Sequence, residues 1–171
     1  MNGLIWLRSD LRLDDNPAIS IADSECKKIA CIYVFSKREW KTHNNANVKL
    51  DFIIRNLSKI SAELSKLNIP LVTVLAENFD EIPNKIAGFC RSNNIFKCYW
   101  NNEFGADELK RDIQVESYLS DSGIESQSFD DQVIFKPGTL LTGQGKPFSV
   151  FTPFKKKWIE NFSIDQLEIE S

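Results

Sequence analysis

The chain of 171 residues has very little histidine and no closely spaced cysteines. Its one histidine is His43, and its four cysteines are Cys26, Cys31, Cys90 and Cys98. No two cysteines form a CxxC pair, so the close ligand spacing of a zinc site is missing. We therefore expect no metal site, and we expect the cysteines to be free thiols in a reducing compartment.

The common catalytic and phosphate-binding motifs are also missing. Neither GxGxxG nor GxxxxGK[ST] occurs, which argues against a dinucleotide held by a glycine-rich turn. The motifs GxSxG and HExxH do not occur either. These absences argue against a self-sufficient enzyme.

Neither an excess of basic charge nor a long apolar run is present. The 21 basic and 24 acidic residues give a net charge of −3, so the composition predicts no basic surface for nucleic acid. No segment approaches the roughly 20 apolar residues of a membrane span. The N-terminal apolar run reaches Arg8 too soon for a signal peptide. We therefore expect a cytoplasmic protein without a membrane partner.

What the sequence does contain is a regular alternation of strand-like and helix-like segments. Apolar and β-branched residues gather in five short segments: 4–7, 29–35, 70–75, 95–100 and 124–129. The first four are nearly continuous in apolar residues, as strands buried on both faces are. Apolar residues recur with helical spacing in three segments: 50–67, 79–90 and 109–119. A shorter helix is predicted to begin at Pro17 with Asn16 as its cap, and Gly123 is predicted to end the third helix.

This alternation predicts an α/β fold. Strands that alternate with helices favour right-handed crossovers and a parallel sheet that is covered on both faces. We predict a Rossmann-like open sheet of five parallel strands over residues 1–130. Such sheets bind ligands beyond the carboxyl ends of their strands, which indicates three candidate loops: 8–16, 36–47 and 101–108. Proline and glycine then recur over residues 131–171, where we expect an extended segment and a short helix that lead to a further domain.

Two segments carry a resemblance to one known family. The first runs from Trp6 to Ala18 and reads WLRSDLRLDDNPA. The second runs from Gly145 to Trp158 and reads GKPFSVFTPFKKKW. Taken singly, they are a charged loop with a helix cap and an aromatic linker. Together and in this order, they resemble the opening and closing signatures of the N-terminal α/β domain of DNA photolyases and cryptochromes.

The resemblance is greatest to bacterial folate-type photolyases, which repair cyclobutane pyrimidine dimers. In that family a second, helical domain binds FAD and receives the flipped dimer from damaged DNA. The resemblance therefore implies that this chain holds no catalytic residues and does not repair DNA alone. Its implied partners are the FAD-binding helical domain of the same protein and, through that domain, damaged DNA.

The α/β domain of the family commonly holds a light-harvesting pigment. The usual pigment is methenyltetrahydrofolate, in a cleft between the two domains, and some members hold a deazaflavin deeper in the α/β domain. His43 and Glu108 match the family's folate-contacting histidine and glutamate. Asp107 stands where the family usually has asparagine, so it keeps an acceptor but loses the amide donor when ionised. A pterin ring offers two adjacent N–H donors, which a carboxylate can accept together.

The residues themselves leave other interpretations open. Acidic residues in the first turn of a helix are stabilised by the helix dipole without any ligand. Lys155, Lys156 and Lys157 could contact DNA phosphates or simply face solvent. We expect Arg8, Asp10 and Arg12 to tie the loops or the further domain by ion pairs, without contacting substrate. The same domain also serves cryptochromes, which are photoreceptors, and a free-standing nucleotide-binding interaction module would use the same fold.

Overall fold

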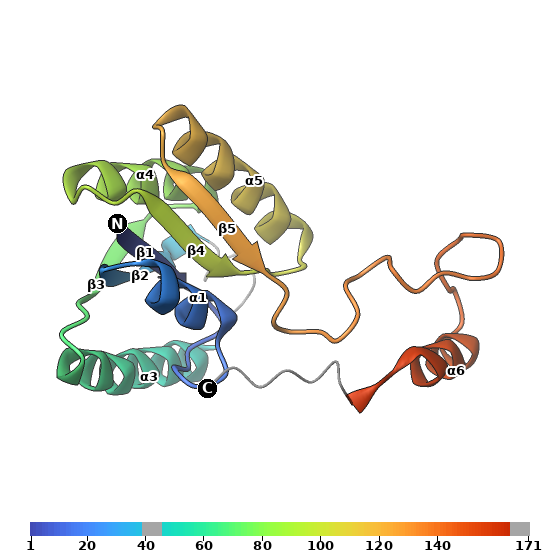
Figure 1. Ribbon diagram of the computed structural model, residues 1–171. Coiled ribbons are helices and arrows are strands. Elements are labelled where there is room, and N and C mark those ends of the chain that lie inside the picture. Colours follow the sequence, from blue (N-terminus) through green and yellow to red (C-terminus); the bar gives the residue numbers. More distant parts are fainter. Residues whose placement is uncertain (39–45, 165–171) are drawn as a thin grey trace.

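A five-stranded sheet forms the centre of the chain in a computed structural model, which describes residues 1–38 and 46–164. All neighbouring strands are parallel, and the strand order is β3-β2-β1-β4-β5 (Figure 1). The strands are β1 (Asn2–Leu7), β2 (Lys28–Ser36), β3 (Leu71–Ala76), β4 (Lys97–Asn101) and β5 (Glu125–Phe129). The predicted α/β, Rossmann-like class is confirmed, and each predicted strand forms close to its predicted bounds.

Helices cover both faces of this sheet. One face carries α1 (Pro17–Glu25) and α3 (Asn47–Lys66), and the other carries α4 (Ile82–Ser92) and α5 (Ala106–Asp121) (Figure 1). The sequence predicted a single helix from residue 79, but a 3-10 turn, η1 (Phe79–Glu81), precedes α4. The side chain of Asn78 accepts a hydrogen bond from the Glu81 N–H at 3.2 Å, which tightens this first turn.

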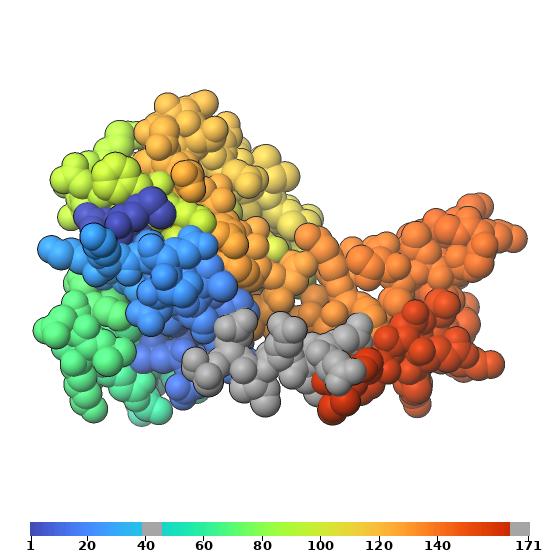
Figure 2. Space-filling view, in the orientation of Figure 1, coloured from blue at the N-terminus to red at the C-terminus, as the bar shows by residue number. Residues whose placement is uncertain are grey.

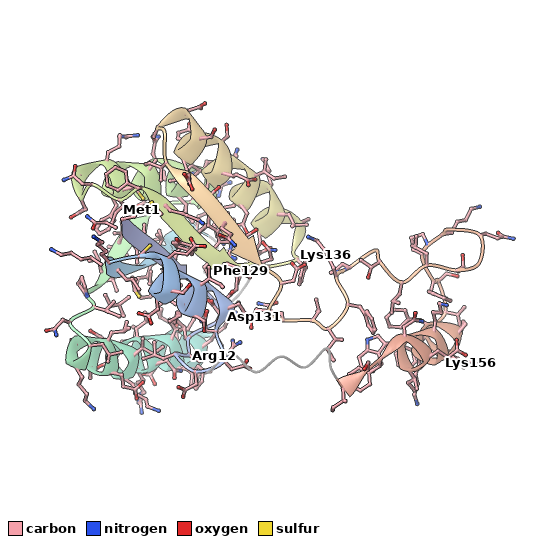
Figure 3. All side chains as sticks on the ribbon, viewed as in Figure 1. Met1, Arg12, Phe129, Asp131, Lys136 and Lys156 are labelled. Carbon is pink, nitrogen blue, oxygen red and sulfur yellow. The ribbon has the colours of Figure 1, made fainter. Side chains whose placement is uncertain are left out.

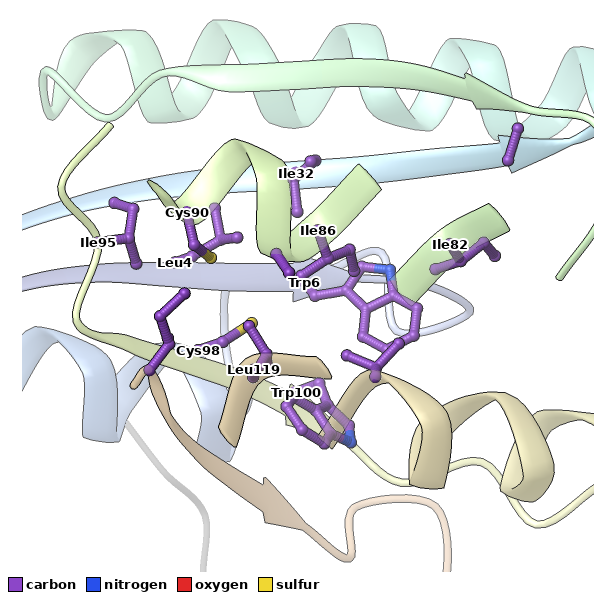
Figure 4. Packing of buried hydrophobic residues seen from close by; sticks show 14 residues of the cluster. Leu4, Trp6, Ile32, Ile82, Ile86, Cys90, Ile95, Cys98, Trp100 and Leu119 are labelled. Carbon is purple, nitrogen blue, oxygen red and sulfur yellow. The ribbon is translucent and has the colours of Figure 1, made fainter. Parts of the chain in front are cut away.

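The position of β1 at the centre of the sheet explains why its residues from Leu4 to Leu7 are all apolar. Leu4 and Trp6 pack into the core beneath α4 and α5, where Trp6 lies next to Trp100 of β4 (Figure 4). Ile5 and Leu7 pack into the opposite core beneath α1 and α3. Successive side chains of a strand point to opposite faces, so a strand between two helical layers needs apolar residues at every position.

Two helix ends follow the sequence prediction. Asn16 caps α1, since its side chain accepts a hydrogen bond from the Ile19 N–H at 3.3 Å, and Pro17 is the first helical residue. Gly123 follows α5 with a φ of 69°, and the Ile124 N–H reaches back to the Leu119 carbonyl at 2.9 Å. This is the left-handed helix end that glycine adopts at little cost.

The chain after β5 is tied to the body at three successive residues before it extends away. Asn102 donates to Asp130 at 2.7 Å, and Gln132 donates to Ser9 at 2.9 Å. Between them, Asp131 forms an ion pair with Arg12 (Figure 3). The exit of the chain from the sheet is therefore anchored to both the first loop and the end of β4.

A small aromatic cluster holds the segment that follows. Helix α6 (Phe151–Asn161) and the residues before it stand to one side of the α/β body (Figure 2). Trp158 packs edge-on against Phe135 and stacks on Phe162, with ring centroids 5.5 and 5.2 Å apart. The short helix expected within residues 131–171 begins at Phe151, and Pro153 is tolerated because it lies in the first helical turn.

Candidate functional site

A hollow of about 590 Å³ opens at the carboxyl edge of the sheet. Its walls come from the ends of β1 and β2, from α3 on one face and from η1, α4 and α5 on the other. The lining residues that matter for its chemistry are Trp6, Arg8, Tyr33, Glu103, Glu108 and Arg111. Open α/β sheets bind ligands at this edge, and the predicted loops 8–16 and 101–108 both contribute to the walls.

The three residues predicted as pigment ligands differ in where they lie relative to the hollow and in whether the structure describes them. Glu108, in the first turn of α5, is partly buried and lines the hollow. Asp107 is exposed one position earlier and contributes no wall among the described lining residues. His43 lies outside the described residues, as do its neighbours in the predicted loop 36–47 from residue 39 to residue 45. The ligand roles of all three residues therefore stay predictions.

The Glu108 carboxylate folds over Gly105, which precedes α5. A Cβ atom added to Gly105 would lie only 2.0 Å from Glu108 Oε2, so the carboxylate occupies space that any other residue would fill. The backbone of Gly105 has φ −68° and ψ 149°, which every residue adopts, so backbone freedom is not the reason for glycine. The arrangement holds a negative charge at the N-terminus of α5, where the helix dipole stabilises it, and beside the hollow.

Four charged side chains form a network at the wall of the site, which Arg8, Arg111 and Glu103 line and Asp112 supports from behind. Arg8 Nη1 donates to Asp112 Oδ2 at 2.6 Å. Arg111 Nη2 donates to Asp112 Oδ1 at 2.7 Å and to Glu103 Oε2 at 2.9 Å. Two guanidinium groups thus share two carboxylates through charge-assisted hydrogen bonds, which compensates charges that burial alone would make very costly.

The surroundings fix the protonation of two groups at the hollow. Burial by itself raises the pKa of Glu103, but the nearby charges of Arg8 and Arg111 outweigh it, and the pKa ends below its ordinary value. Burial, reinforced by the charge of Glu103, raises the pKa of Tyr33 to about 12. Glu103 is therefore an ionised acceptor near neutral pH, and the Tyr33 hydroxyl keeps its proton.

Glu103 should make the stability of the chain depend on acidic pH. Its pKa in the folded state lies below the unfolded value of 4.5, so its stabilisation is complete above that value and is lost as the pH falls through the folded pKa. We expect the Glu103→Gln variant to show a flatter loss of unfolding free energy than the wild type in urea titrations at a series of acidic pH values. Glu116→Gln, an exposed change on α5, should keep the wild-type slope. Equal slopes in all three proteins would contradict this expectation.

The loop after β1 is held by hydrogen bonds within the chain. Asp10 accepts from the Arg8 N–H at 2.8 Å and from Asn101 Nδ2 at 2.6 Å. Arg12 ties the same loop to Asp131 (Figure 3). The predicted ion pair between loops is therefore confirmed for Arg12, whereas Asp10 holds the loop by hydrogen bonds to uncharged groups and the Arg8 side chain pairs with Asp112 of α5.

Sequence reasoning missed the charged wall and Gly105. One signal for the wall was available, because Arg111 shares the buried face of α5 with Val115 and Leu119, at successive spacings of four residues. A charge on an apolar helical face indicates a buried partner. No comparable signal marks Gly105, because its role depends on where the Glu108 side chain folds.

The structure also describes the cysteines, the metal-binding side chains, the hydropathy of the helices and the three lysines of α6. All four cysteines are free, and Cys26 is only partly buried. Within the described residues, no group of three or more metal-binding side chains comes together. No helix in the described part of the chain combines the length and the hydropathy needed to cross a bilayer. Lys155, Lys156 and Lys157 are exposed on α6.

The sequence matches the family described as DNA photolyase over residues 3–170. It is 33% identical over 159 residues to the deoxyribodipyrimidine photo-lyase of Vibrio cholerae, and 31% identical over 158 residues to that of Escherichia coli. These matches cover 93% and 92% of this chain but 34% and 33% of the two relatives. The chain thus spans about a third of the length of the curated relatives that it matches.

Solved structures share the fold. A class III photolyase from Agrobacterium tumefaciens has a TM-score of 0.75 at 24% identity, covering 95% of this chain and 32% of its own. An archaeal photolyase from Sulfolobus tokodaii also has a TM-score of 0.75, at 22% identity, covering 99% and 36%. A cryptochrome from Synechocystis sp. has a TM-score of 0.73 at 22% identity, covering 94% and 33%. Both functional classes use this fold, so the fold alone does not separate them.

Proposed function

Because the chain belongs to the DNA photolyase family, we propose that it is the light-harvesting domain of a deoxyribodipyrimidine photolyase, which repairs UV-induced pyrimidine dimers in DNA. The observation that carries this proposal is the hollow at the carboxyl edge of the sheet. The chain's own task is to hold a pigment at a fixed place and orientation, and no catalytic residue is assigned to it. The bound pigment would supply light absorption and the transfer of excitation to a flavin.

The hollow suits a conjugated ring system in size and in chemistry. Its volume of about 590 Å³ falls within the range of small-molecule sites. Tyr33, Phe52 and Ile53 offer apolar and aromatic surface on the α3 side. Glu108 offers a carboxylate on the α5 side, which can accept two adjacent N–H groups of a pterin ring, or the single ring N–H of a flavin-like ring.

For the pigment itself we propose methenyltetrahydrofolate, because Glu108 and His43 match the ligands of the folate-type members. A deazaflavin or another flavin-like ring is the alternative. It is favoured by the position of the hollow, between α3 and α5 within the α/β body. The Sulfolobus tokodaii photolyase, whose structure holds two FAD molecules with the implication of a novel light-harvesting cofactor, supports the same alternative.

The remaining proposals concern the rest of the protein. We propose that residues 131–171 lead from the α/β domain, residues 1–130, to a helical domain that binds FAD and contacts damaged DNA. We further propose a cytoplasmic location. A cryptochrome-type photoreceptor would use the same α/β domain, and the Synechocystis cryptochrome of the same fold keeps that alternative open.

Titration of the chain with methenyltetrahydrofolate, followed by near-UV absorbance, tests the pigment site. We expect Glu108→Gln to weaken binding by about 1–3 kcal/mol, or about 5- to 150-fold in Kd, because one acceptor oxygen is lost from the carboxylate. Gly105→Ala should weaken binding to a similar extent, because the new methyl group displaces the Glu108 carboxylate while the backbone stays unstrained. His43→Ala should weaken binding as well.

The controls for this titration lie on the same helix. Asp121→Asn, exposed at the far end of α5, should leave Kd unchanged. Asp107→Ala should have a smaller effect than Glu108→Gln, because Asp107 is exposed. Wild-type affinity in both Glu108→Gln and Gly105→Ala would refute the site. Binding of riboflavin without binding of the folate would keep the domain assignment and replace the folate with a flavin-like ring.

A further inference from the structure

Two arginine side chains contact the ring of Trp6 at the edge of the hollow. The guanidinium carbon of Arg8 is 4.7 Å from the centroid of the Trp6 ring, and that of Arg111 is 4.8 Å away. Trp6 is 1% exposed, and it borders the hollow. Both distances are those of cation–π contacts. A neutral indole beside the proposed pigment site therefore has two positive charges in direct contact.

Arg8 uses only one of its three guanidinium nitrogens to contact carboxylates. Its Nη1 atom donates to Asp112, but Nε and Nη2 are buried without a hydrogen-bond acceptor in the described part of the chain. Buried donors without an acceptor are costly, and a simple structural ion pair would use them. Because the guanidinium group lies over the Trp6 ring, the π face of the indole is the neighbour available to these N–H groups.

In a light-harvesting site, an indole beside the pigment can quench the excited state by giving up an electron. Among the side chains, indole loses an electron most readily, and an excited conjugated ring beside it can accept one. In that step one electron leaves Trp6, which becomes a radical cation, and the excited ring gains the electron, while no bond or proton moves. Trp100, at 5.9 Å between ring centroids, adds a second indole that can share the positive charge (Figure 4). The absorbed energy then ends as heat when the electron returns.

We propose that Arg8 and Arg111 protect the excited state of the bound pigment by making electron loss from Trp6 unfavourable. The inference rests on the proposed light-harvesting function. Both guanidinium groups attract the neutral ring, but they repel the positive charge that the ring would carry after oxidation. The contacts are buried, where water screens charges least, and the carboxylates of Asp112 and Glu103 that pair with the arginines are what oppose this repulsion. The arginines act through Trp6 and are positioning residues, with no contact to a reacting bond.

The fluorescence lifetime of a bound dye measures this protection directly. Methenyltetrahydrofolate and riboflavin serve as separate probes, each bound to the full chain. Arg111→Gln removes one of the two charges, and we expect it to shorten the dye lifetime by about twofold or more. Arg111→Lys keeps the charge and should stay near the wild-type lifetime. In the Arg111→Gln background, Trp6→Phe should restore the wild-type lifetime, because the indole that borders the hollow is gone.

Each outcome decides between the alternatives. A wild-type lifetime in Arg111→Gln would overturn the inference. So would a longer lifetime in Trp6→Phe alone, because Trp6 would then quench the dye despite both arginines; this measurement stands even if Arg111→Gln does not fold. If a dye binds but Arg111→Gln does not shorten its lifetime, or Trp6→Phe does not restore the lifetime in that background, the inference fails and the proposed function stands. If neither dye binds, the proposed function fails and the inference falls with it.

Discussion

Replacing Asp112 with alanine is expected to lower the free energy of unfolding by about 3–5 kcal/mol. Asp112 accepts hydrogen bonds from Arg8 at 2.6 Å and from Arg111 at 2.7 and 2.9 Å, and its side chain is 11% exposed. After the change, Glu103 is left to compensate both buried guanidinium groups, and its contact with Arg8 is 3.9 Å long. Urea unfolding at neutral pH, followed by circular dichroism, measures the loss.

The matched control for Asp112 lies on the same helix. Asp121 is exposed near the end of α5, so Asp121→Ala should change the unfolding free energy by no more than about 0.5 kcal/mol. Asp112→Leu separates the charge from the volume of the side chain, and it should be as destabilising as the alanine variant because both leave Glu103 to compensate the two arginines. Stability of Asp112→Ala equal to that of Asp121→Ala would show that the buried charges are compensated without Asp112.

Replacing Asn16 with alanine should cost about 2–4 kcal/mol of unfolding free energy. Part of the cost is the lost cap of α1, where the Asn16 side chain accepts from the Ile19 N–H. The rest comes from two further contacts of this fully buried side chain. Asn101 Nδ2 donates to Asn16 at 2.8 Å, and the Asn16 side chain donates to the Arg12 carbonyl at 3.1 Å. Thermal unfolding followed by circular dichroism gives the difference from the wild type.

Asn78 provides the comparison for Asn16. It also caps a helical turn, with its side chain accepting from the Glu81 N–H at 3.2 Å, but it is only partly buried. Asn78→Ala should therefore lose the cap alone, about 1 kcal/mol. Equal losses in the two variants would mean that the buried contacts of Asn16 add nothing to the cap.

The strands, the start of α1 and the end of α5 could be predicted because their signals are local. The β-branched and apolar runs predict strands from neighbouring residues alone, and the cap at Asn16 and the glycine at Gly123 need no knowledge of the fold. The strand order is different. It brings β1 next to β4 and lets Arg8 reach Asp112, 104 residues further along the chain. No local pattern contains that pairing.

The candidate site could be predicted in its location but not in its construction. Parallel strands place their carboxyl ends at one edge, which is why the loops 8–16 and 101–108 were expected to meet. The resemblance to photolyases selected Glu108. The reason for Gly105 next to it, and the use of Arg111 beside Trp6, depend on how side chains fold over one another in three dimensions.

The three ties at the exit of β5 have a consequence for the proposed light-harvesting role. Asp130, Asp131 and Gln132 each contact a different residue of the α/β body through a hydrogen bond or an ion pair, so the chain leaves the sheet in one fixed direction. Transfer of excitation between two dyes depends on the angle between their transition dipoles as well as on their separation. These three contacts thus fix the direction of the segment that follows β5, and with it the orientation of a domain attached to that segment. The optical coupling of the two chromophores would then depend on residues that contact neither ring.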